Sequence, residues 1–270
     1  MEQAPRLLIA GYGTMTAAMV EGWLRAGFPA QALTACGPNP KVMPDGMRFV
    51  TGVPQAEQFD ILLLGMKPQK LAEAAPALAQ LAGPRTTLVS VLAGVELASL
   101  AVRFPHAGAI VRLMPNLAAA LGKSPIGLVA QGLGPVQRTQ IDRLATMLGQ
   151  PEWLDDESRF DLVAALAGSG PAFVYRFIDV LAAGADRLGL EQAQAQRLAL
   201  AMVEGAAALA AAAPHPPGEL ARRVASPGGM TQKGLDVLDE GEALGRLVTE
   251  ALRAARDRGR EMARKARGEG

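Results

Sequence analysis

The sequence predicts an α/β protein in which a doubly wound parallel sheet is followed by an all-helical C-terminal domain. In the first half, short apolar runs alternate with helical stretches, which is the pattern of parallel strands joined by crossover helices. The apolar runs lack strict alternation, as expected of strands that are covered on both faces. After about Asp155 no strand signal remains. We therefore expect two domains, at residues 1–155 and 156–270.

Five short runs of the first half are the expected strands of this sheet. The first strand leads straight into a glycine-rich turn, and the runs are Arg6–Ala10, Leu33–Cys36, Ile61–Leu64, Thr87–Val91 and Ala109–Leu113. Helical patterns at Met15–Ala26 and Gln69–Leu81 lie between strands at the spacing of βαβ units. Two further runs, at Ile126–Val129 and Glu152–Leu154, can extend the sheet at an edge.

The second half reads as a series of helices. Ser158–Leu188 and Glu191–Ala213 are the expected long helices, and the motif Gly168–Pro171 interrupts the first of them. The segment Pro214–Gly218 is a firm break. Two more helices should begin at about Met230 and about Glu242. Small side chains on the second long helix would allow close contact within the chain or with a second copy, at Ala193, Ala201, Gly205, Ala208 and Ala212.

Charge and cysteine usage exclude several classes of protein. The 27 basic residues nearly balance 26 acidic ones, so no strong field attracts nucleic acid. The basic tail from Arg253 to Arg267 contains interleaved acids, which favours a solvated helix face with i,i+4 pairs. The single cysteine, Cys36, excludes an internal disulfide and a cysteine-based zinc site. We expect it at the end of a buried strand.

No membrane or export segment is expected. The N-terminus, Met1–Arg6, lacks the basic region of a signal peptide. No charge-free apolar run approaches the roughly 20 residues that span a bilayer. We therefore expect a cytoplasmic protein with no membrane partner, no nucleic-acid partner and no metal site.

A glycine-rich turn follows the first strand and opens the first helix. Gly11 permits a tight turn, Gly13 lets the backbone approach a pyrophosphate, and the helix N–H groups at Thr14 and Met15 face the negative charge. Thr16 occupies the third glycine position of the fingerprint. The turn lies inside a βαβ unit, so we expect a Rossmann-like dinucleotide site.

The end of the second strand bears on cofactor choice. An acidic residue there would bind a ribose 2′-hydroxyl and select NAD, but no Asp or Glu occurs between Arg25 and Asp45. Asn39 and Lys41 could instead contact a 2′-phosphate. We therefore expect NADPH to be preferred over NADH. Asn39 is also an ordinary turn residue in an Asn-Pro loop.

Four later segments are placed where ligands bind. Three follow strands at the carboxyl edge of the expected sheet: Gly65–Pro68, Val91–Gly94 and Arg112–Asn116. The fourth, Ser226–Thr231, lies in the helical domain, where we expect Ser226 to cap a helix and Pro227 to take its first position. The glycines that follow leave backbone N–H groups open to an anion. An ordinary capped helix is the alternative.

In combination, the motifs GYGTM, GMKP, SVLAG, RLMPN, GSGPAF and SPGGMT resemble the pyrroline-5-carboxylate reductase family across essentially the whole chain. The resemblance implies reduction of 1-pyrroline-5-carboxylate to proline with NADPH or NADH. It also implies homodimers paired through interlocked C-terminal helices, which assemble further into decamers, with sites formed between domains or subunits.

The resemblance assigns roles to individual residues. The pyrophosphate would be held by Gly11, Gly13, Thr14 and Met15, and the rest of the cofactor cleft would be lined by Met66, Lys67, Pro68, Ala93, Gly94 and, near the nicotinamide, Asn116. The substrate carboxylate would meet the N–H groups of Gly228, Gly229 and Met230, with Thr231 at the imine nitrogen as the catalytic side chain. The helix break beside the substrate would be shaped by Gly168, Ser169, Gly170 and Pro171. A protonated imine is already electrophilic, so no strong acid is required, and His106 and His215 lie outside the motifs.

Departures from the family pattern keep alternatives open. Leu117-Ala118 stands where Thr-Pro is usual, Gly122-Lys123-Ser124 replaces a glycine-alanine-glycine stretch, and Ala167, Phe173 and Met230 replace Ser, Tyr and Thr. One alternative is a same-fold reductase for a six-membered cyclic imine acid or a small carbonyl acid. A β-hydroxyacid dehydrogenase-like enzyme would need a catalytic lysine, and after Asp155 only Lys233 and Lys265 occur. Another alternative is a nucleotide-sensing protein without turnover.

Overall fold

The structure is a computed structural model that describes residues 4–267, with side chains described as far as Arg264. The chain forms two compact units. Unit 1 comprises the chain up to Ser169 together with the chain from Ala254 onward, and unit 2 comprises Gly170–Arg253. The last helix therefore has residues in both units. Part of the N-terminal segment that bears on export, Met1–Gln3, lies outside the described residues.

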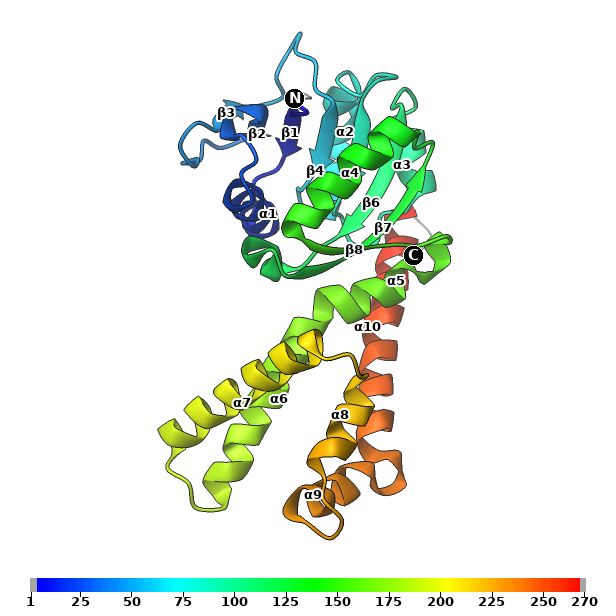
Figure 1. The fold of residues 1–270 in the computed structure, drawn as a ribbon. Coiled ribbons are helices and arrows are strands. Elements are labelled where there is room, and N and C mark those ends of the chain that lie inside the picture. The colour runs from blue at the N-terminus through cyan, green and yellow to red at the C-terminus, as the bar shows by residue number, and fades with distance from the viewer. Residues whose placement is uncertain (1–3, 268–270) are drawn as a thin grey trace. The chain divides into compact units, whose positions relative to one another are not determined.

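Unit 1 contains one sheet of eight strands in the order β3-β2-β1-β4-β5-β6-β7-β8 (Figure 1). The strand order reverses beside β1, which makes the β1–β4 border a topological switch point. All neighbouring strands are parallel except β6 and β7, and the fold class predicted from the sequence is confirmed. The strands are β1 Leu7–Ala10, β2 Leu33–Gly37, β3 Arg48–Thr51, β4 Ile61–Leu64, β5 Thr87–Ser90, β6 Ala109–Met114, β7 Ser124–Gln131 and β8 Gly149–Trp153.

Helices cover both faces of this sheet (Figure 1). One core lies under α1 (Thr14–Arg25) and α4 (Pro135–Leu148), and the other lies under α2 (Leu71–Ala79) and α3 (Leu97–Arg103). Because both faces are covered, every residue of β1 and β4 is buried. The remaining helix of this unit before residue 169 is the one-turn α5, Phe160–Val163, which continues into a π-helical segment, Ala164–Ser169.

Two elements of unit 1 differ from the sequence-based expectation. Strand β3, Arg48–Thr51, was not predicted, because its residues are exposed or half-buried and no apolar run marks it. Strand β7 is longer than the predicted Ile126–Val129 and runs antiparallel to β6. A two-sided apolar run indicates burial, and it does not indicate strand direction.

Unit 2 contains helices only among the described residues, as predicted. They are α6 Gly170–Arg187, α7 Gln192–Ala212, α8 Pro217–Val224, α9 Met230–Asp239 and the first part of α10 Ala243–Arg267. Helix α8 was missed because Pro214–Gly218 was interpreted as a break. Pro217 instead takes the first helical position, where a missing N–H group costs nothing.

Helices α6 and α7 pack through alanines, while much of unit 2 stays exposed in the single chain. The buried contact consists of Ala182, Ala195 and Ala199. The five small residues predicted to allow close helix contact are all exposed, at Ala193, Ala201, Gly205, Ala208 and Ala212. Large apolar side chains are exposed as well, including Phe177, Leu198, Met202, Leu209 and Leu247. A single copy of the chain thus leaves extensive apolar surface uncovered on these helices.

Helix α7 is long and apolar enough by length and composition to cross a membrane, with a mean hydropathy of 1.2 over its best window. It carries Arg197 and Glu204, so it is not the charge-free run that we looked for in the sequence. One such helix is weak evidence for a membrane span. Packing against α6 accounts for the buried alanines on one side of it.

Cys36 lies buried in β2, at the strand end where the sequence placed it, and burial raises the pKa of its thiol to about 11. At pH 8 the thiolate fraction should be about one thousandth, and the thiolate is the reactive form. We expect iodoacetamide to leave Cys36 unmodified in the native protein and to modify it fully in guanidinium chloride, as read by mass spectrometry. Rapid modification without denaturant would contradict the burial of this thiol.

Candidate active site

The loops after β1 and β4 meet at the switch point of the sheet. Gly11 has a φ of +93°, and a β-carbon there would lie 2.6 Å from the backbone nitrogen of Met66. Only glycine combines that backbone conformation with this close approach. The structure therefore brings the glycine-rich turn and the Gly65–Pro68 segment together, as the sequence predicted for a shared edge.

Thr16 explains the missing third glycine of the turn. Its side chain is fully buried, and its hydroxyl accepts the Gly13 N–H at 2.9 Å and lies 3.1 Å from the Gly11 carbonyl oxygen, to which it donates. Its methyl group occupies the space that a β-carbon on Gly65 would need. From the sequence alone, Thr16 is only a departure from the glycine fingerprint of dinucleotide-binding turns. In the structure its hydroxyl ties the turn to the first turn of α1.

The start of α1 offers an anion site beside this turn. The N-cap is Gly13, which has no side chain to bond the N–H groups of the first turn, and no acidic residue lies in that turn. Gly13 and Thr14 are exposed, and Met15 is half-buried. A β-carbon on Gly13 would meet nothing within 4 Å, so the approach to the helix N–H groups is open. Open N–H groups and a helix dipole favour a bound phosphate group.

Asn39 and Lys41 lie on the exposed segment that follows β2. Lys41 has no ion pair among the side chains that the structure describes. The next cation along the chain, Arg48, lies at the amino end of β3 and pairs with Glu57 at 2.6 Å. Lys41 is therefore available to a ligand, whereas Arg48 is engaged.

The other predicted cofactor residues differ from one another in solvent exposure. Lys67 is exposed, and Met66 and Pro68 are half-buried, with Pro68 opening a short 3₁₀ helix. Ala93 is exposed in the loop after β5. Gly94 is buried, because the end of α10 packs against it.

Both polar atoms of the Asn116 side chain form hydrogen bonds within unit 1. The side chain is 4% exposed, and its Nδ2 donates to the Ala167 carbonyl at 2.8 Å. Its Oδ1 accepts the Ala118 N–H at 2.9 Å, and its own backbone N–H donates to Ser124 Oγ at 2.9 Å. Asn116 thus joins the end of β6 to the π-helical segment. A position of Asn116 near a nicotinamide stays a prediction.

The predicted helix break at Gly168–Pro171 is a π-helical segment, Ala164–Ser169, that passes into α6. Such wide turns often occur at functional sites. A β-carbon on Gly168 would lie 3.8 Å from Met114 Sδ, so this segment lies against the end of β6. Ser169 and Gly170 are half-buried, and a β-carbon on Gly170 would meet nothing within 4 Å.

The Ser226–Thr231 segment in unit 2 is a turn followed by a helix start. The Gly229 N–H donates to the Ser226 carbonyl at 2.9 Å, and Gly228 has a φ of +71°. With Pro227 before it, this is the pattern of a type II turn. The expectation that Ser226 caps the helix and that Pro227 opens it is wrong, because the Pro-Gly pair forms the turn and Gly229 is the N-cap.

The start of α9 is open to solvent in the single chain. No side chain caps it, no acidic residue lies in its first turn, and Met230 is 94% exposed. Gly228 and Thr231 are also exposed, and Gly229 is half-buried. The N–H groups at this helix start can receive an anion such as a carboxylate.

A buried charge cluster that was not predicted from the sequence surrounds Arg112 of β6. Arg112 is 2% exposed, pairs with Glu157 at 2.7 Å and stacks on the ring of Phe160 at 4.0 Å. The same Glu157 oxygen accepts the Leu97 N–H, and Arg112 Nε has no hydrogen-bond partner among the described residues. The signal was an arginine inside an otherwise apolar strand, since a buried arginine needs partners.

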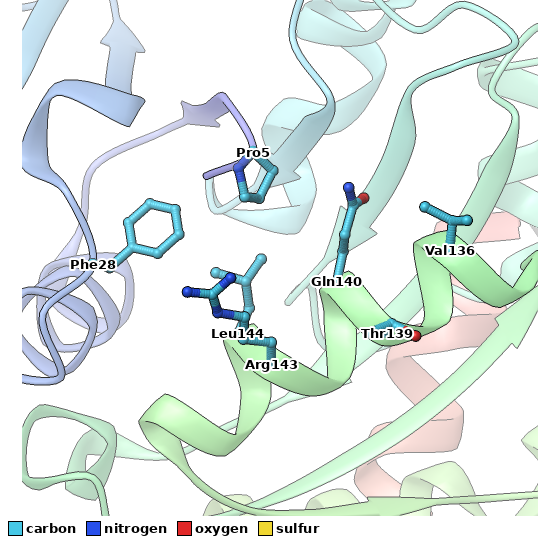
Figure 2. Close-up of a pocket in the computed structure, with 7 residues that line it drawn as sticks. All are labelled: Pro5, Phe28, Val136, Thr139, Gln140, Arg143 and Leu144. Carbon is cyan, nitrogen blue, oxygen red and sulfur yellow. The ribbon is translucent and has the colours of Figure 1, made fainter. Parts of the chain in front are cut away.

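Another hollow of unit 1 lies away from these segments. It is a cavity of about 250 Å³. Its lining side chains, drawn in Figure 2, come from the segment before β1, from the loop after α1 and from α4. Pro5 and Phe28 mark it as lying at the amino ends of the strands, opposite the glycine-rich turn. It contains no predicted site residue. Among residues 4–267, no three His, Cys, Asp or Glu side chains form a group that could hold a metal ion.

Comparison with known sequences gives matches over nearly all of the chain. Residues 157–262 match the family described as pyrroline-5-carboxylate reductase dimerisation, and residues 6–94 match the family described as NADP oxidoreductase coenzyme F420-dependent. A pyrroline-5-carboxylate reductase from Pseudomonas aeruginosa is 33% identical over 266 residues, covering 96% of this chain and 97% of that protein. One from Synechocystis is 36% identical over 213 residues, or 78% of each chain.

Solved structures agree with the fold. A pyrroline-5-carboxylate reductase from Coxiella burnetii superposes with a TM-score of 0.87 at 25% identity, covering 97% of this chain and 99% of that one. The pyrroline carboxylate reductase of Plasmodium falciparum with NADP bound has a TM-score of 0.82 at 22% identity, over 96% and 98% of the two chains. The second likeness shows the fold alone.

Thr16 can be tested by removing its hydroxyl without changing its shape. We expect Thr16→Val to remove the side-chain acceptor of the Gly13 N–H, to cost about 0.5–1.5 kcal/mol in the free energy of unfolding, and to weaken dinucleotide binding about tenfold. Thr16→Ser keeps the hydroxyl and should bind nearly as well as the native protein. Urea unfolding and a fluorescence titration with NADPH measure the two effects.

The matched control is Thr139→Val, which removes an exposed hydroxyl on α4 that donates to the Pro135 carbonyl. It should change neither quantity. Native affinity in the Thr16→Val variant would show that the hydroxyl does not support the turn.

Proposed function

We propose that this chain, which belongs to the pyrroline-5-carboxylate reductase family, reduces 1-pyrroline-5-carboxylate to L-proline, the last step of proline synthesis. The observation that carries the proposal is the relative at 33% identity over 96% of the chain. The matched family regions include the two segments that carry the proposed chemistry, Gly11–Thr16 within residues 6–94 and Ser226–Thr231 within residues 157–262.

The residues of unit 1 fit a dinucleotide. Gly11 approaches Met66 closely and adds no side chain to the turn. The open start of α1 provides backbone N–H groups, and the exposed Lys41 provides a cation. When bound, the nicotinamide supplies a hydride to the C=N carbon of the imine. In this proposal Gly11, Gly13, Thr14 and Met15 hold the pyrophosphate. The rest of the cleft is lined by Asn39, Met66, Lys67, Pro68, Ala93, Gly94 and Asn116.

The residues at the start of α9 fit a small anionic imine. Gly228, Gly229 and Met230 surround the substrate carboxylate at a helix start with no competing acid. The N–H groups of Gly228 and Met230 bind it, whereas the Gly229 N–H donates to the Ser226 carbonyl and fixes the turn. Thr231 orients the imine nitrogen through its hydroxyl, and this is its catalytic role. Ser169 and Gly170 shape the substrate side at the π-helical segment. Positioning and electrostatics, without a covalent intermediate, then suffice for catalysis.

The proposed enzyme works as an oligomer in the cytoplasm. The exposed apolar side chains of α6, α7 and α10 support pairing of two copies through these helices, since such a surface is costly in water. The matched family is itself described as a dimerisation region. We propose a homodimer as the basic assembly and a decamer as the larger one. We also propose that residues 1–155 and 156–270 act as the cofactor and substrate domains.

A different imine substrate is the second candidate, and Leu117 motivates it. This residue follows Asn116 and is 53% exposed, so an apolar side chain is presented where the family pattern has a polar one. A panel of five- and six-membered cyclic imine acids, assayed with one enzyme preparation, compares the two. Higher kcat/KM with the six-membered ring would favour the second candidate. Cofactor binding without turnover of any imine would favour a nucleotide-binding relative.

The first assay follows NADPH oxidation at 340 nm with 1-pyrroline-5-carboxylate. We expect turnover by the native protein and a fall in kcat of about 10²-fold in Thr231→Ala, because a hydroxyl that orients the reacting nitrogen acts mainly in the transition state. Thr231→Ser should retain most of the activity, and Thr139→Ala serves as the control. Unchanged turnover in Thr231→Ala would keep the enzyme and discard the role of Thr231.

Cofactor preference can be tested at Lys41. We propose that NADPH is preferred over NADH and that Lys41→Ala lowers the ratio of their kcat/KM values by about tenfold, through the loss of one charge contact to the 2′-phosphate. The matched control is Arg85→Ala, which removes one exposed cation before β5, at the amino edge of the sheet. An equal ratio in the native protein and in Lys41→Ala would exclude this lysine as the determinant.

A further inference from the structure

The end of α10 packs against the loop that follows β5. Gly94 in this loop has a φ of +70°, and a β-carbon there would lie 2.9 Å from Met262 Cβ and 3.1 Å from the backbone nitrogen of Ala263. Ala263 is 3% exposed. Both sides of the contact belong to unit 1. The loop and the helix thus approach each other too closely to admit a side chain at Gly94.

The spacing of small residues on α10 permits this approach. Ala255, Gly259 and Ala263 recur every four residues and therefore share one face of the helix. A β-carbon on Gly259 would lie 3.6 Å from the side chain of Asp161 in α5. One face of α10 is therefore held at two points, by α5 and by the loop after β5. The predicted solvated face exists, because Arg253, Arg258, Arg260 and Arg264 are exposed. The packed face was not predicted, and the ion pairs have i,i+1 and i,i+3 spacing in place of the expected i,i+4.

Charges surround the contact with α5. Burial raises the pKa of Asp161, whose charge also interacts with Arg112, Glu96, Arg260 and Glu157. Other charges of the tail pair within α10 itself, as Arg256–Asp257 and Arg258–Glu261. Arg260 of α10 therefore interacts electrostatically with Asp161, as Arg112 and Glu157 of the buried charge cluster do. Packing and charge both attach the end of α10 to the loops at the carboxyl edge of the sheet.

We infer that the last turns of α10 form a latch that holds the Val91–Val95 loop in its cofactor-binding conformation, with Met262 as the positioning residue. The inference rests on the proposed function, in which exposed Ala93 and buried Gly94 line the cofactor cleft. In this proposal Met262 acts on the loop through Gly94. The latch makes the end of a helix from the dimerisation region part of the cofactor site.

The test uses full-length protein and reads nucleotide binding, loop exchange and catalysis. We expect Met262→Gly, which removes the β-carbon that faces Gly94, to weaken NADPH binding about five- to tenfold, from the loss of about one half-buried apolar contact. It should also speed amide hydrogen exchange in the Val91–Leu97 segment and leave the KM for 1-pyrroline-5-carboxylate within about twofold. Met262→Ala should leave all three quantities near their native values, because it keeps the β-carbon that faces Gly94. Arg264→Gly, at an exposed position on the same turn, is the matched control, because it carries the same loss of helix propensity.

A second variant guards against misfolding of the first. Ala263→Val keeps Met262 but adds bulk at a buried contact, so it should displace the tail and give the same changes. Unchanged NADPH affinity and unchanged loop exchange in both variants overturn the latch. Faster exchange throughout unit 1, with no excess in the loop, also overturns it in favour of a purely structural role. If native protein binds NADPH but fails to turn over the imine, the proposed function falls, and the binding and exchange measurements still decide the latch.

Discussion

The backbone contact between Gly11 and Met66 is the constraint on which the ligand edge of this protein depends. Strand order reverses at β1, so the loops after β1 and β4 leave neighbouring strands at the same level and have to pass one another. Gly11 allows that passage through its positive φ, and Gly65 leaves room for the methyl group of Thr16. The Thr16 hydroxyl then holds the turn in place. An open helix start beside the turn follows from this arrangement.

Most of the fold of unit 1 could be predicted because burial on both faces leaves a local signal. Ile61–Leu64 is a continuous apolar run and is a strand with the predicted bounds. Strand β3 was missed because an edge strand that is half-exposed carries no such run. Helix α8 was missed because a proline pair signals both a break and a helix start. The division at residues 155 and 156 stays a prediction.

The sequence predicted the segments of the candidate site, but it could not predict the contacts among these segments. Gly11 and Lys67 are recognisable from short motifs, because each motif consists of residues that are neighbours in the sequence. Asn116 donates a hydrogen bond to the Ala167 carbonyl, and Met262 packs on Gly94. In each case the two residues are more than fifty positions apart, and no local sequence pattern identifies such partners. The Ser226–Gly229 turn was misjudged for a different reason, since Ser-Pro is compatible with a cap as well as with a type II turn.

Unit 1 is discontinuous, and this bears on how the protein is made. Its sheet is encoded before residue 169, but the helix turns that pack on Gly94 and Asp161 come from Ala254 onward. During synthesis the chain emerges from the ribosome in order, and N-terminal units generally fold first. Here the sheet emerges without its last helix and has to wait for all of unit 2. The nascent intermediate therefore exposes the Gly94 loop until the turns from Ala254 onward have emerged, and the proposed cofactor site is completed only after them.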